Sequence, residues 1–480
     1  MGYFKKQKRA ILLVLILVIN AVLGFYIMYP VSLFHDPAMH SEIVYMIREQ
    51  GYPTTWQPFA ENEFTYPPLF HYLSLFVSVT GISLIDSVRL AGILFFLLIP
   101  ISMYLYLSSF KKIDKNIPIM SAAGIAFMPL VGNIFLLGEF PQVLAMALII
   151  LMLYTIKTER HLWTALITGL VVLAHPFMFI AAIILFLYNL KNMKSKGIKI
   201  ILLYFLIAIL VSCIWLPGYL GIYSNAASGQ WQNAVYNLEQ PFFWFWPSQD
   251  IIKFLFDWNF LTPVILPLSV IGFIKTKNSF LRSFFLLCFA FTVFHLPFTQ
   301  LKIYDLFAIP SVIMAAFGVN CIFQKTSAWK NPIARLSPII IFILLMGIFQ
   351  VAHFVHAKNN WTYGNETPDP ALIQSAIWLN GYDSSFVRIY STDATEWVGI
   401  LSNKMPLNPS VSSLEAYSDE YKRQLEANNK IRDSIRASDT ETLKSVLEEW
   451  NLKYLIVKED FLANYLKKIN DSDWKVYEVI

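Results

Sequence analysis

The sequence predicts a polytopic α-helical membrane protein that carries a small α/β domain at its C-terminal end. Hydrophobic residues make up 56% of the 480-residue chain, and charged residues only 14%. A water-soluble chain of this length could not bury so much apolar surface. Long apolar runs fill residues 1–355, whereas residues 356–480 are polar and alternate between helical and strand patterns. These observations divide the chain into a transmembrane domain and a C-terminal domain.

The first apolar run covers residues 11–29 and follows four basic residues between positions 5 and 9. It is long enough to cross a bilayer, and no small-residue cleavage site precedes Tyr29-Pro30. We therefore expect an uncleaved signal anchor whose N-terminus is cytoplasmic.

Ten further apolar runs bring the expected number of transmembrane helices to about eleven: 88–109, 117–137, 140–156, 162–174, 176–190, 199–217, 260–274, 283–299, 304–323 and 336–355. One more segment, residues 69–84, is apolar but short and follows Tyr66-Pro67-Pro68.

The distribution of Lys and Arg decides how segment 69–84 is placed. If it does not cross the bilayer, 19 of the 23 Lys and Arg of residues 1–355 lie on the cytoplasmic side; if it does, only 7 do. Cytoplasmic loops of membrane proteins carry the excess of basic residues. Segment 69–84 is thus predicted to be a membrane-surface or re-entrant helix on the outer side. The C-terminal domain of this multi-pass plasma-membrane protein then lies outside as well.

Two long loops are predicted on the outer side, 30–86 and the aromatic-rich 218–259. Loops of this length are usually functional, although aromatic residues also form interfacial belts, so loop 218–259 is either a lid or part of a belt. Of the 13 acidic residues in the membrane domain, 11 face outward in this topology. We therefore expect the active site at the outer face.

The C-terminal domain, residues 356–480, holds 19 acidic and 14 basic residues. Its pattern predicts helices at 369–380 and, with breaks, at 415–449. Strands are predicted at 387–391, at 454–457 as a buried strand, and at 474–480 as an edge strand. These elements make a small α/β domain.

The predicted site begins directly after the first span. Asp36 followed by Pro37 has the form of a helix N-cap with proline at the first helical position. His40 lies four residues later, on the same side of that helix. A carboxylate and an imidazole are then presented together above the bilayer, although capping alone would also account for Asp36.

Further polar residues follow at the expected outer ends of later segments: Tyr66, His71, Arg89, Glu139, Gln142, His175 and Lys302. For two of these residues, a purely structural role is an alternative to a functional one. Lys302 has the position of an interfacial lysine that extends its amine to water, and His175 before Pro176 has that of a helix end.

Taken together, these motifs resemble the GT-C superfamily of membrane glycosyltransferases. In that family an acidic residue follows the first span, and Asp36 matches it. Pro67-Pro68-Leu69 matches a motif that opens a surface helix, and Arg89 resembles the arginine that begins the second span. The family also has an outer C-terminal domain. The resemblance implies transfer of a sugar from a polyprenyl (dolichyl or undecaprenyl) phosphate carrier at the outer membrane face.

Residue roles follow from the resemblance and stay expectations. Asp36 is the expected general base of an inverting hexosyl- or pentosyltransferase, with His40 as its orienting partner. Lys302, Arg89 and His175 are expected to bind the carrier phosphate. The expected sugar or acceptor contacts are Glu139, Tyr66, His71 and Gln142.

Departures from the family pattern narrow the expected substrates and cofactors. The C-terminal domain has no Trp-Trp-Asp motif and the outer loops have no Asp-x-Asp, which argues against an oligosaccharyltransferase and an obligatory metal. Aminoarabinose transferases carry Lys-Pro-Pro where this sequence has Tyr66-Pro67-Pro68, so the resemblance does not imply an aminoarabinose substrate. No cofactor is required, although Mg²⁺ or Mn²⁺ on Asp36, His40 and Glu139 stays open. Expected partners are the lipid-linked donor, a lipid, glycan or protein acceptor and the bilayer, but no nucleic acid.

A transporter or flippase is the main alternative. Such proteins carry inverted repeats and charges near the bilayer midplane, whereas this sequence has no convincing repeat and its charges gather toward the outer face. A non-catalytic receptor would leave the acid-rich first loop unexplained.

Overall fold

The computed structural model describes residues 2–28, 36–51, 66–136, 138–175, 262–293, 306–326, 332–360, 369–385, 387–392, 395–407 and 419–480, with isolated positions between 178 and 211. The chain divides into two compact units, which are described separately. The first comprises Met1–Tyr29, Ala91–Leu216 and Trp231–Trp361. The second comprises Pro30–Leu90, Pro217–Gln230 and Thr362–Ile480.

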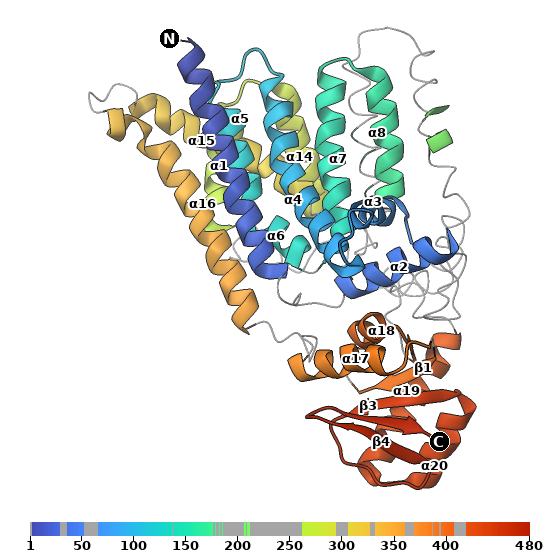
Figure 1. The fold of residues 1–480 in the computed structure, drawn as a ribbon. Coiled ribbons are helices and arrows are strands. Elements are labelled where there is room, and N and C mark those ends of the chain that lie inside the picture. The colour runs from blue at the N-terminus through green and yellow to red at the C-terminus, as the bar shows by residue number, and fades with distance from the viewer. Residues whose placement is uncertain are drawn as a thin grey trace, which may run out of the picture. The chain divides into compact units, whose positions relative to one another are not determined.

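Long helices that lie side by side make up the first unit (Figure 1). They are α1 (Gly2–Met28), α4 (Leu84–Ser108), α5 (Ile117–Ala126), α6 (Pro129–Leu136), α7 (Phe140–Lys157), α8 (His161–Ala174), α13 (Thr262–Lys275), α14 (Ser279–Val293), α15 (Ala308–Thr326) and α16 (Pro332–Asn360). The first turns of α4, up to Leu90, belong to the second unit.

Five described helices are long and apolar enough to cross a membrane: Arg9–Met28, Leu84–Ser108, Phe140–Lys157, Ala308–Lys325 and Ser337–Val355. A sixth span exists if α5 and α6 are counted as one. The run 117–137, predicted as a single helix, is bent by 45° between these two helices, just before Pro129. Proline suits the first turn of a new helix because it has no N–H to donate.

The remaining predicted spans are only partly described. Helices α8, α13 and α14, which match three of them, have 14 or 15 residues each. The runs 176–190 and 199–217 and the aromatic loop 218–259 lie outside the described residues, apart from isolated positions in the two runs. The count of about eleven transmembrane helices therefore stays a prediction, while the multi-pass character is confirmed.

Glycine allows two helices of the first unit to approach very closely. A Cβ atom on Gly272 of α13 would overlap the carbonyl oxygen of Met314 on α15, and one on Gly318 would overlap that of Leu268. Ser269 Oγ also donates a 2.7 Å hydrogen bond to the carbonyl of Ser311. Small residues and interhelical hydrogen bonds are the usual means of association between helices in lipid.

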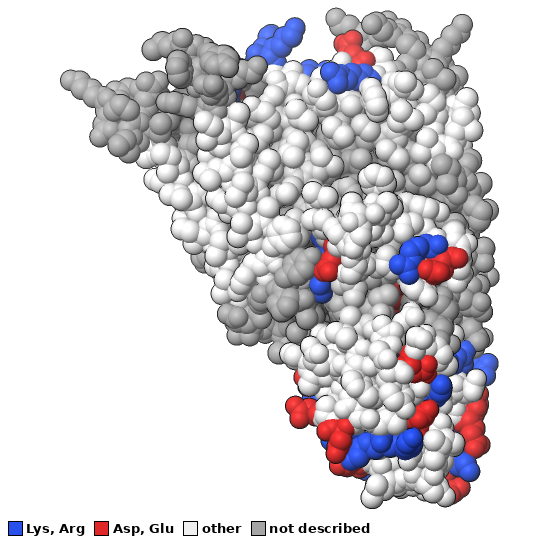
Figure 2. Space-filling view, in the orientation of Figure 1, with Lys and Arg blue, Asp and Glu red and all other residues white. Residues whose placement is uncertain are grey.

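Charged side chains of the first unit gather at one end of its helices. The turn between α4 and α5 carries Lys111, Lys112 and Lys115, and the turn between α7 and α8 lies beside Lys157 and Arg160. Figure 2 shows these charges above a broad white surface. This is the end predicted to be cytoplasmic; the side of the membrane on which it lies stays a prediction.

In the second unit, two helices precede the first turns of α4: α2 (Asp36–Gln50) and α3 (Leu69–Ser78). Helix α3 has 10 residues, so it is about 15 Å long, half the thickness of the hydrocarbon core. Its length fits the prediction of a segment that does not cross. The start of α4 differs from prediction, because this helix begins at Leu84 rather than at residue 88.

A five-stranded sheet forms the centre of the C-terminal part, with strand order β2-β1-β3-β5-β4. The strands are β1 (Arg388–Ser391), β2 (Met405–Pro406), β3 (Leu452–Val457), β4 (Leu466–Asp471) and β5 (Lys475–Val479), flanked by helices α17 (Pro370–Tyr382), α18 (Thr395–Ser402), α19 (Asp419–Ala437) and α20 (Thr440–Glu449). Strand β1 is parallel to β2 and β3, whereas β5 is antiparallel to β3 and β4.

Alternation along β3 builds a core on each face of this sheet. Tyr454 and Ile456 pack with residues of α17 and α18. Leu455 and Val457 pack with residues of α19 and α20. Successive strand residues point to opposite faces, so the small α/β domain predicted from the sequence is a three-layer structure.

One strand prediction is wrong. The segment 474–480, predicted as an edge strand, contains β5, which lies between β3 and β4. The edge strand on this side of the sheet is β4, which escaped prediction because its sequence, Leu-Lys-Lys-Ile-Asn-Asp, is mostly polar. Lysines on an edge strand discourage pairing with another chain.

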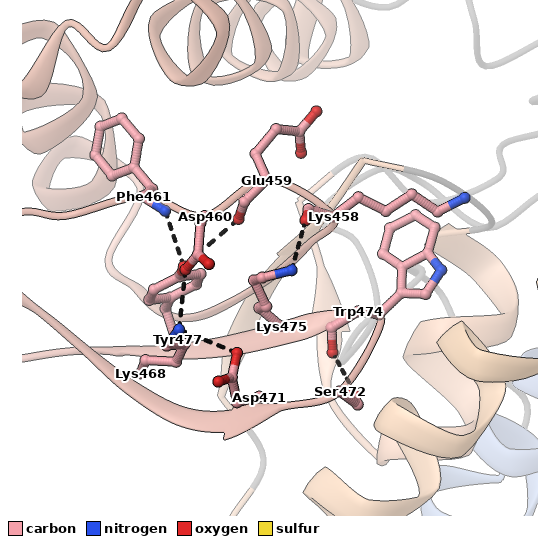
Figure 3. Close-up of polar contacts among 10 residues, drawn as sticks. All are labelled: Lys458, Glu459, Asp460, Phe461, Lys468, Asp471, Ser472, Trp474, Lys475 and Tyr477. Carbon is pink, nitrogen blue, oxygen red and sulfur yellow. Dashed lines mark hydrogen bonds and ion pairs between the residues drawn. The ribbon is translucent and has the colours of Figure 1, made fainter.

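Ion pairs and hydrogen bonds connect the side chains at this edge of the sheet, around β4 and β5 (Figure 3). Lys468 of β4 pairs with Asp460 at 2.9 Å and with Asp471 at 3.0 Å. The hydroxyl of Tyr477 accepts a hydrogen bond from the Phe461 amide and donates one to Asp460. The hydrogen bond from Lys468 is the main cause of a lowered Asp460 pKa.

Candidate functional site

The second unit brings together three of the predicted site residues: His40, Tyr66 and His71. Helix α2 begins at Asp36-Pro37, as predicted, and presents His40 one turn later. The side chain of Asp36 lies outside the described residues, so its expected contact with His40 stays a prediction.

His40 and His71 form a hydrogen-bonded pair that is wholly buried, with neither residue exposed. His40 Nδ1 lies 3.1 Å from His71 Nε2, and His71 Nδ1 lies 3.0 Å from the carbonyl oxygen of Pro67. A carbonyl oxygen can only accept, so His71 Nδ1 carries a proton. Burial, followed by the charge of His40, lowers the pKa of His71 well below its usual value, so its ring is neutral at pH 7.

These contacts assign the tautomers of both rings. Neutral His71 has a lone pair on Nε2, which accepts the proton of His40 Nδ1. The acceptor nitrogen of a neutral His40 is then Nε2. The sequence predicts that His71 contacts the sugar or the acceptor; in the structure its two ring nitrogens contact His40 and the Pro67 carbonyl, and this geometry favours support of His40.

Aromatic rings enclose the pair. The Tyr66 ring lies 5.6 Å from that of His40 and 5.4 Å from that of His71, between centroids, and Phe70 lies 5.4 Å from each. Below them, an apolar cluster joins α2, α3 and α18; it consists of Met39, Ile43, Met46 and Ile47 with Tyr45, Tyr66, Leu75 and Ile400 packed against them. The pair is therefore held on a rigid surface.

Arg89 lies in the second turn of α4, with 7% of its side chain exposed. Its Nη1 donates to Asp86 Oδ1 at 3.2 Å, and Asp86 Oδ2 accepts from Ser83 Oγ at 2.7 Å. The guanidinium carbon lies 5.5 Å from the centre of the Trp397 ring on α18. Such a distance is typical of a cation–π contact.

Sequence reasoning did not find Trp397 or helix α18. The only local signal was a tryptophan within a short segment between two predicted elements, and its partner Arg89 lies far away in the sequence. The contact depends on how the C-terminal part packs on α2 and α4, which no local pattern encodes.

Three predicted residues lie in the first unit. Glu139 immediately precedes α7, and His175 immediately follows α8. Because α7 and α8 form an antiparallel pair joined by a short turn, both residues lie at the end opposite Lys157. Gln142 is buried in the first turn of α7 and donates its backbone N–H to the carbonyl of Glu139 at 3.0 Å.

Two predicted features cannot be located. Lys302 lies outside the described residues, as does the side chain of Asp36. Within the described part of the chain, no three His, Cys, Asp or Glu side chains are grouped to hold a metal ion. The set of Asp36, His40 and Glu139 therefore stays an expectation.

Comparison with known proteins gives structural relatives only. No protein-family model matches the chain, and no curated protein matches it in sequence. Among solved structures, ArnT from Cupriavidus metallidurans has a TM-score of 0.59 and 12% identity, covering 97% of both chains. The archaeal oligosaccharyltransferase AglB from Archaeoglobus fulgidus, solved with an inhibitory peptide and a dolichol-phosphate, has a TM-score of 0.57 and 14% identity. The match covers 95% of this chain and 70% of AglB.

A third match is the arabinofuranosyltransferase AftD from Mycobacteria, with a TM-score of 0.57 and 13% identity. It covers 97% of this chain but only 40% of AftD. ArnT has also been solved with undecaprenyl phosphate bound. At 12–14% identity these likenesses establish the fold.

Proposed function

We propose that this chain, which has the fold of the GT-C membrane glycosyltransferases, transfers a sugar from a polyprenyl-phosphate carrier to an acceptor hydroxyl. The observation that carries the proposal is the likeness over at least 95% of the chain to structures of proteins solved with dolichol-phosphate or undecaprenyl phosphate. His40, His71 and Arg89, on α2, α3 and α4, add support, because they are buried polar groups with defined partners within one unit.

Asp36 is the proposed general base. Its carboxylate takes the proton of the acceptor hydroxyl while that oxygen bonds to the anomeric carbon. The bond from this carbon to the carrier phosphate breaks, and its electron pair leaves with the phosphate. Attack and departure on opposite faces invert the configuration. A positioned base contributes about 10²–10⁴-fold to the rate.

Arg89, Lys302 and His175 are proposed to stabilise the negative charge that develops on the leaving phosphate. Arginine suits this task because its planar fork of N–H donors matches two phosphate oxygens. Glu139, Gln142 and Tyr66 are proposed to bind the sugar or the acceptor.

His40 is proposed to act beside Asp36. Its Nδ1 donates to His71, so Nε2 of the neutral ring is a hydrogen-bond acceptor that can receive the proton of the acceptor hydroxyl beside the Asp36 carboxylate. Since His71 fixes the ring, the direction of that lone pair is set before substrate binds.

The proposal is tested by sugar transfer from a panel of radiolabelled polyprenyl-phosphate sugars, using the full-length protein in nanodiscs. Asp36→Asn should lower turnover at least about 100-fold while carrier still binds. Lys302→Ala should weaken binding of the carrier. Asp114→Asn, in the turn between α4 and α5, is the matched control, because it removes a carboxylate at the opposite end of α4 and should leave turnover unchanged.

A wild-type protein that neither binds nor turns over any carrier would contradict the proposal. Movement of intact carrier across the bilayer would then be measured, since it is the sign of a flippase. Repeating active assays with EDTA, and then with added Mg²⁺ or Mn²⁺, tells whether a divalent cation takes part.

A further inference from the structure

Helix α18 of the C-terminal part is seated firmly against α2 within the second unit (Figure 1). Ile400 packs on the apolar cluster of Met39, Ile43 and their neighbours. A Cβ atom on Gly399 would lie 3.1 Å from Glu42 Oε1 and 3.0 Å from Pro406 Cδ. The α18 backbone is therefore close to α2, with little freedom to slide or rotate.

Trp397 lies three residues before Ile400 and thus on the same side of α18. It is 1% exposed, and its ring lies 5.5 Å from the guanidinium of Arg89. Asp86 contacts the same guanidinium at 3.2 Å. Arg89 is thus held by a carboxylate from its own helix and by an aromatic ring from a distant part of the chain.

Trp397 contacts Arg89 through the face of its indole ring and not through its N–H group. Its Nε1 is buried and makes no hydrogen bond within the described part of the structure. A cation over an aromatic face is attracted by the ring quadrupole, and more strongly where water is excluded. A phenylalanine ring at this position would preserve that attraction, whereas an aliphatic side chain would not.

We infer that Trp397 is a positioning residue, which fixes the guanidinium of Arg89 for the carrier phosphate and so makes carrier affinity depend on the C-terminal part of the chain. The inference rests on the proposed function, in which Arg89 binds that phosphate. Arginine loses rotamer freedom when it binds, and holding it in place beforehand removes that cost from binding. The effect should therefore fall on carrier affinity and on the donor KM, and kcat should fall as well, because Arg89 is also proposed to stabilise the leaving phosphate.

The test compares Trp397→Leu with Trp397→Phe in the full-length protein in nanodiscs, measuring undecaprenyl phosphate binding and the donor KM. Trp397→Leu should weaken both about tenfold, and Trp397→Phe should stay within about twofold of wild type. The matched control is Trp450→Leu. Trp450 is 6% exposed, and its ring lies 5.6 Å from the guanidinium of Arg388, within the same domain but at the C-cap of α20.

A second arm separates positioning from mere stability. In an Arg89→Ala background, Trp397→Leu should weaken carrier binding no further, because it acts through Arg89. Additive losses, or an equal loss in Trp450→Leu, would overturn the inference while leaving an active wild-type enzyme. Absence of carrier binding by wild type itself would overturn the proposed function and this inference with it, so the two failures are distinguishable.

Discussion

The two units of the molecule bury polar groups in different ways. In the first unit, Asn20 of α1 and Gln350 of α16 are buried and make no side-chain hydrogen bond within the described residues. Its helices associate by shape, because no Cβ atom would fit between Gly272 and the Met314 carbonyl. In the second unit, two buried polar side chains have defined partners: His40 pairs with His71, and Arg89 pairs with Asp86.

This difference indicates where chemistry is built. An unpaired buried polar group costs free energy, whereas a paired one has a fixed orientation. Catalytic groups need fixed orientations, and the proposed site residues His40 and Arg89 have fixed orientations in the second unit. The described helices of the first unit associate by close packing, although the proposed contacts Glu139, Gln142 and His175 also lie in that unit. Substitutions that change volume should therefore affect the first unit most, and substitutions that change a charge or a hydrogen bond should affect the second.

The largest effect is expected for Gly272→Val in the first unit. Any Cβ at this position would overlap the Met314 carbonyl, so α13 and α15 would have to separate along their contact. We expect a destabilisation on the order of 4 kcal/mol or more, seen as loss of monodisperse protein and a lower Tm. Gly347→Ala on α16 is the control, because a Cβ there meets nothing within 4 Å. Equal behaviour of the two variants would contradict shape-driven packing.

The next effect is expected for Asp383→Asn at the end of α17. Asp383 Oδ2 accepts from Tyr454 at 2.6 Å and from Lys453 at 3.0 Å. Burial opposes ionisation of this carboxyl, but hydrogen bonds from Ser385, Tyr454 and Lys453 outweigh it and hold its pKa well below the usual range. Hydrogen bonds to a charged group predict a loss of about 2 kcal/mol in unfolding free energy at pH 7.

The loss in unfolding free energy caused by Asp383→Asn should depend on pH. A carboxyl with a lowered folded pKa stabilises the protein above its unfolded value, near 3.9, and loses that contribution as the pH falls toward the folded value. The gap in unfolding free energy between wild type and Asp383→Asn should therefore shrink below about pH 4. A gap that stays constant in acid would show that the charge plays no part.

Local sequence signals predicted correctly the elements that form from interactions between residues close together in the sequence. Helix α2 begins at Asp36-Pro37, as predicted, and the helix predicted over 369–380 is α17, which Asp369 caps. Apolar runs of span length gave α1, α4, α7, α15 and α16 because lipid demands continuous apolar helices. The basic clusters also lie together at one end of the first unit.

Signals were insufficient where partners are distant in the sequence. His40 and His71 were each identified, but their hydrogen bond depends on how α2 packs against α3. Trp397 and Arg89 meet only because α18 packs on α2, and β4 exists because β5 offers it a partner. Pairing of this kind is decided by tertiary structure, where local propensity has little influence.

The His40–His71 pair predicts a pH-dependent stability. Because burial keeps His71 neutral in the folded state, the unfolded state takes up the proton first as the pH falls below about 6.5. Folding stability is then lost, with a slope that approaches about 1.4 kcal/mol per pH unit. His71→Gln can still accept from His40 and donate to Pro67 but cannot titrate. Its Tm should match wild type near pH 7.5 and exceed it near pH 5; parallel curves would exclude His71 as the source.

The smallest effect is expected for Gly399→Ala, which tests directly how closely α18 packs on α2. The new methyl group would lie 3.1 Å from Glu42 Oε1 and 3.0 Å from Pro406 Cδ, so both neighbours must yield by a few tenths of an ångström. Overpacking of this kind costs about 1 kcal/mol, part of which is offset because alanine favours a helix over glycine. Gly381→Ala on α17, where a Cβ meets nothing within 4 Å, has the same helical benefit without the crowding. If unfolding shows Gly399→Ala to be no less stable than Gly381→Ala, then α18 is not seated tightly. The route from Trp397 to Arg89 would then lose its rigid support.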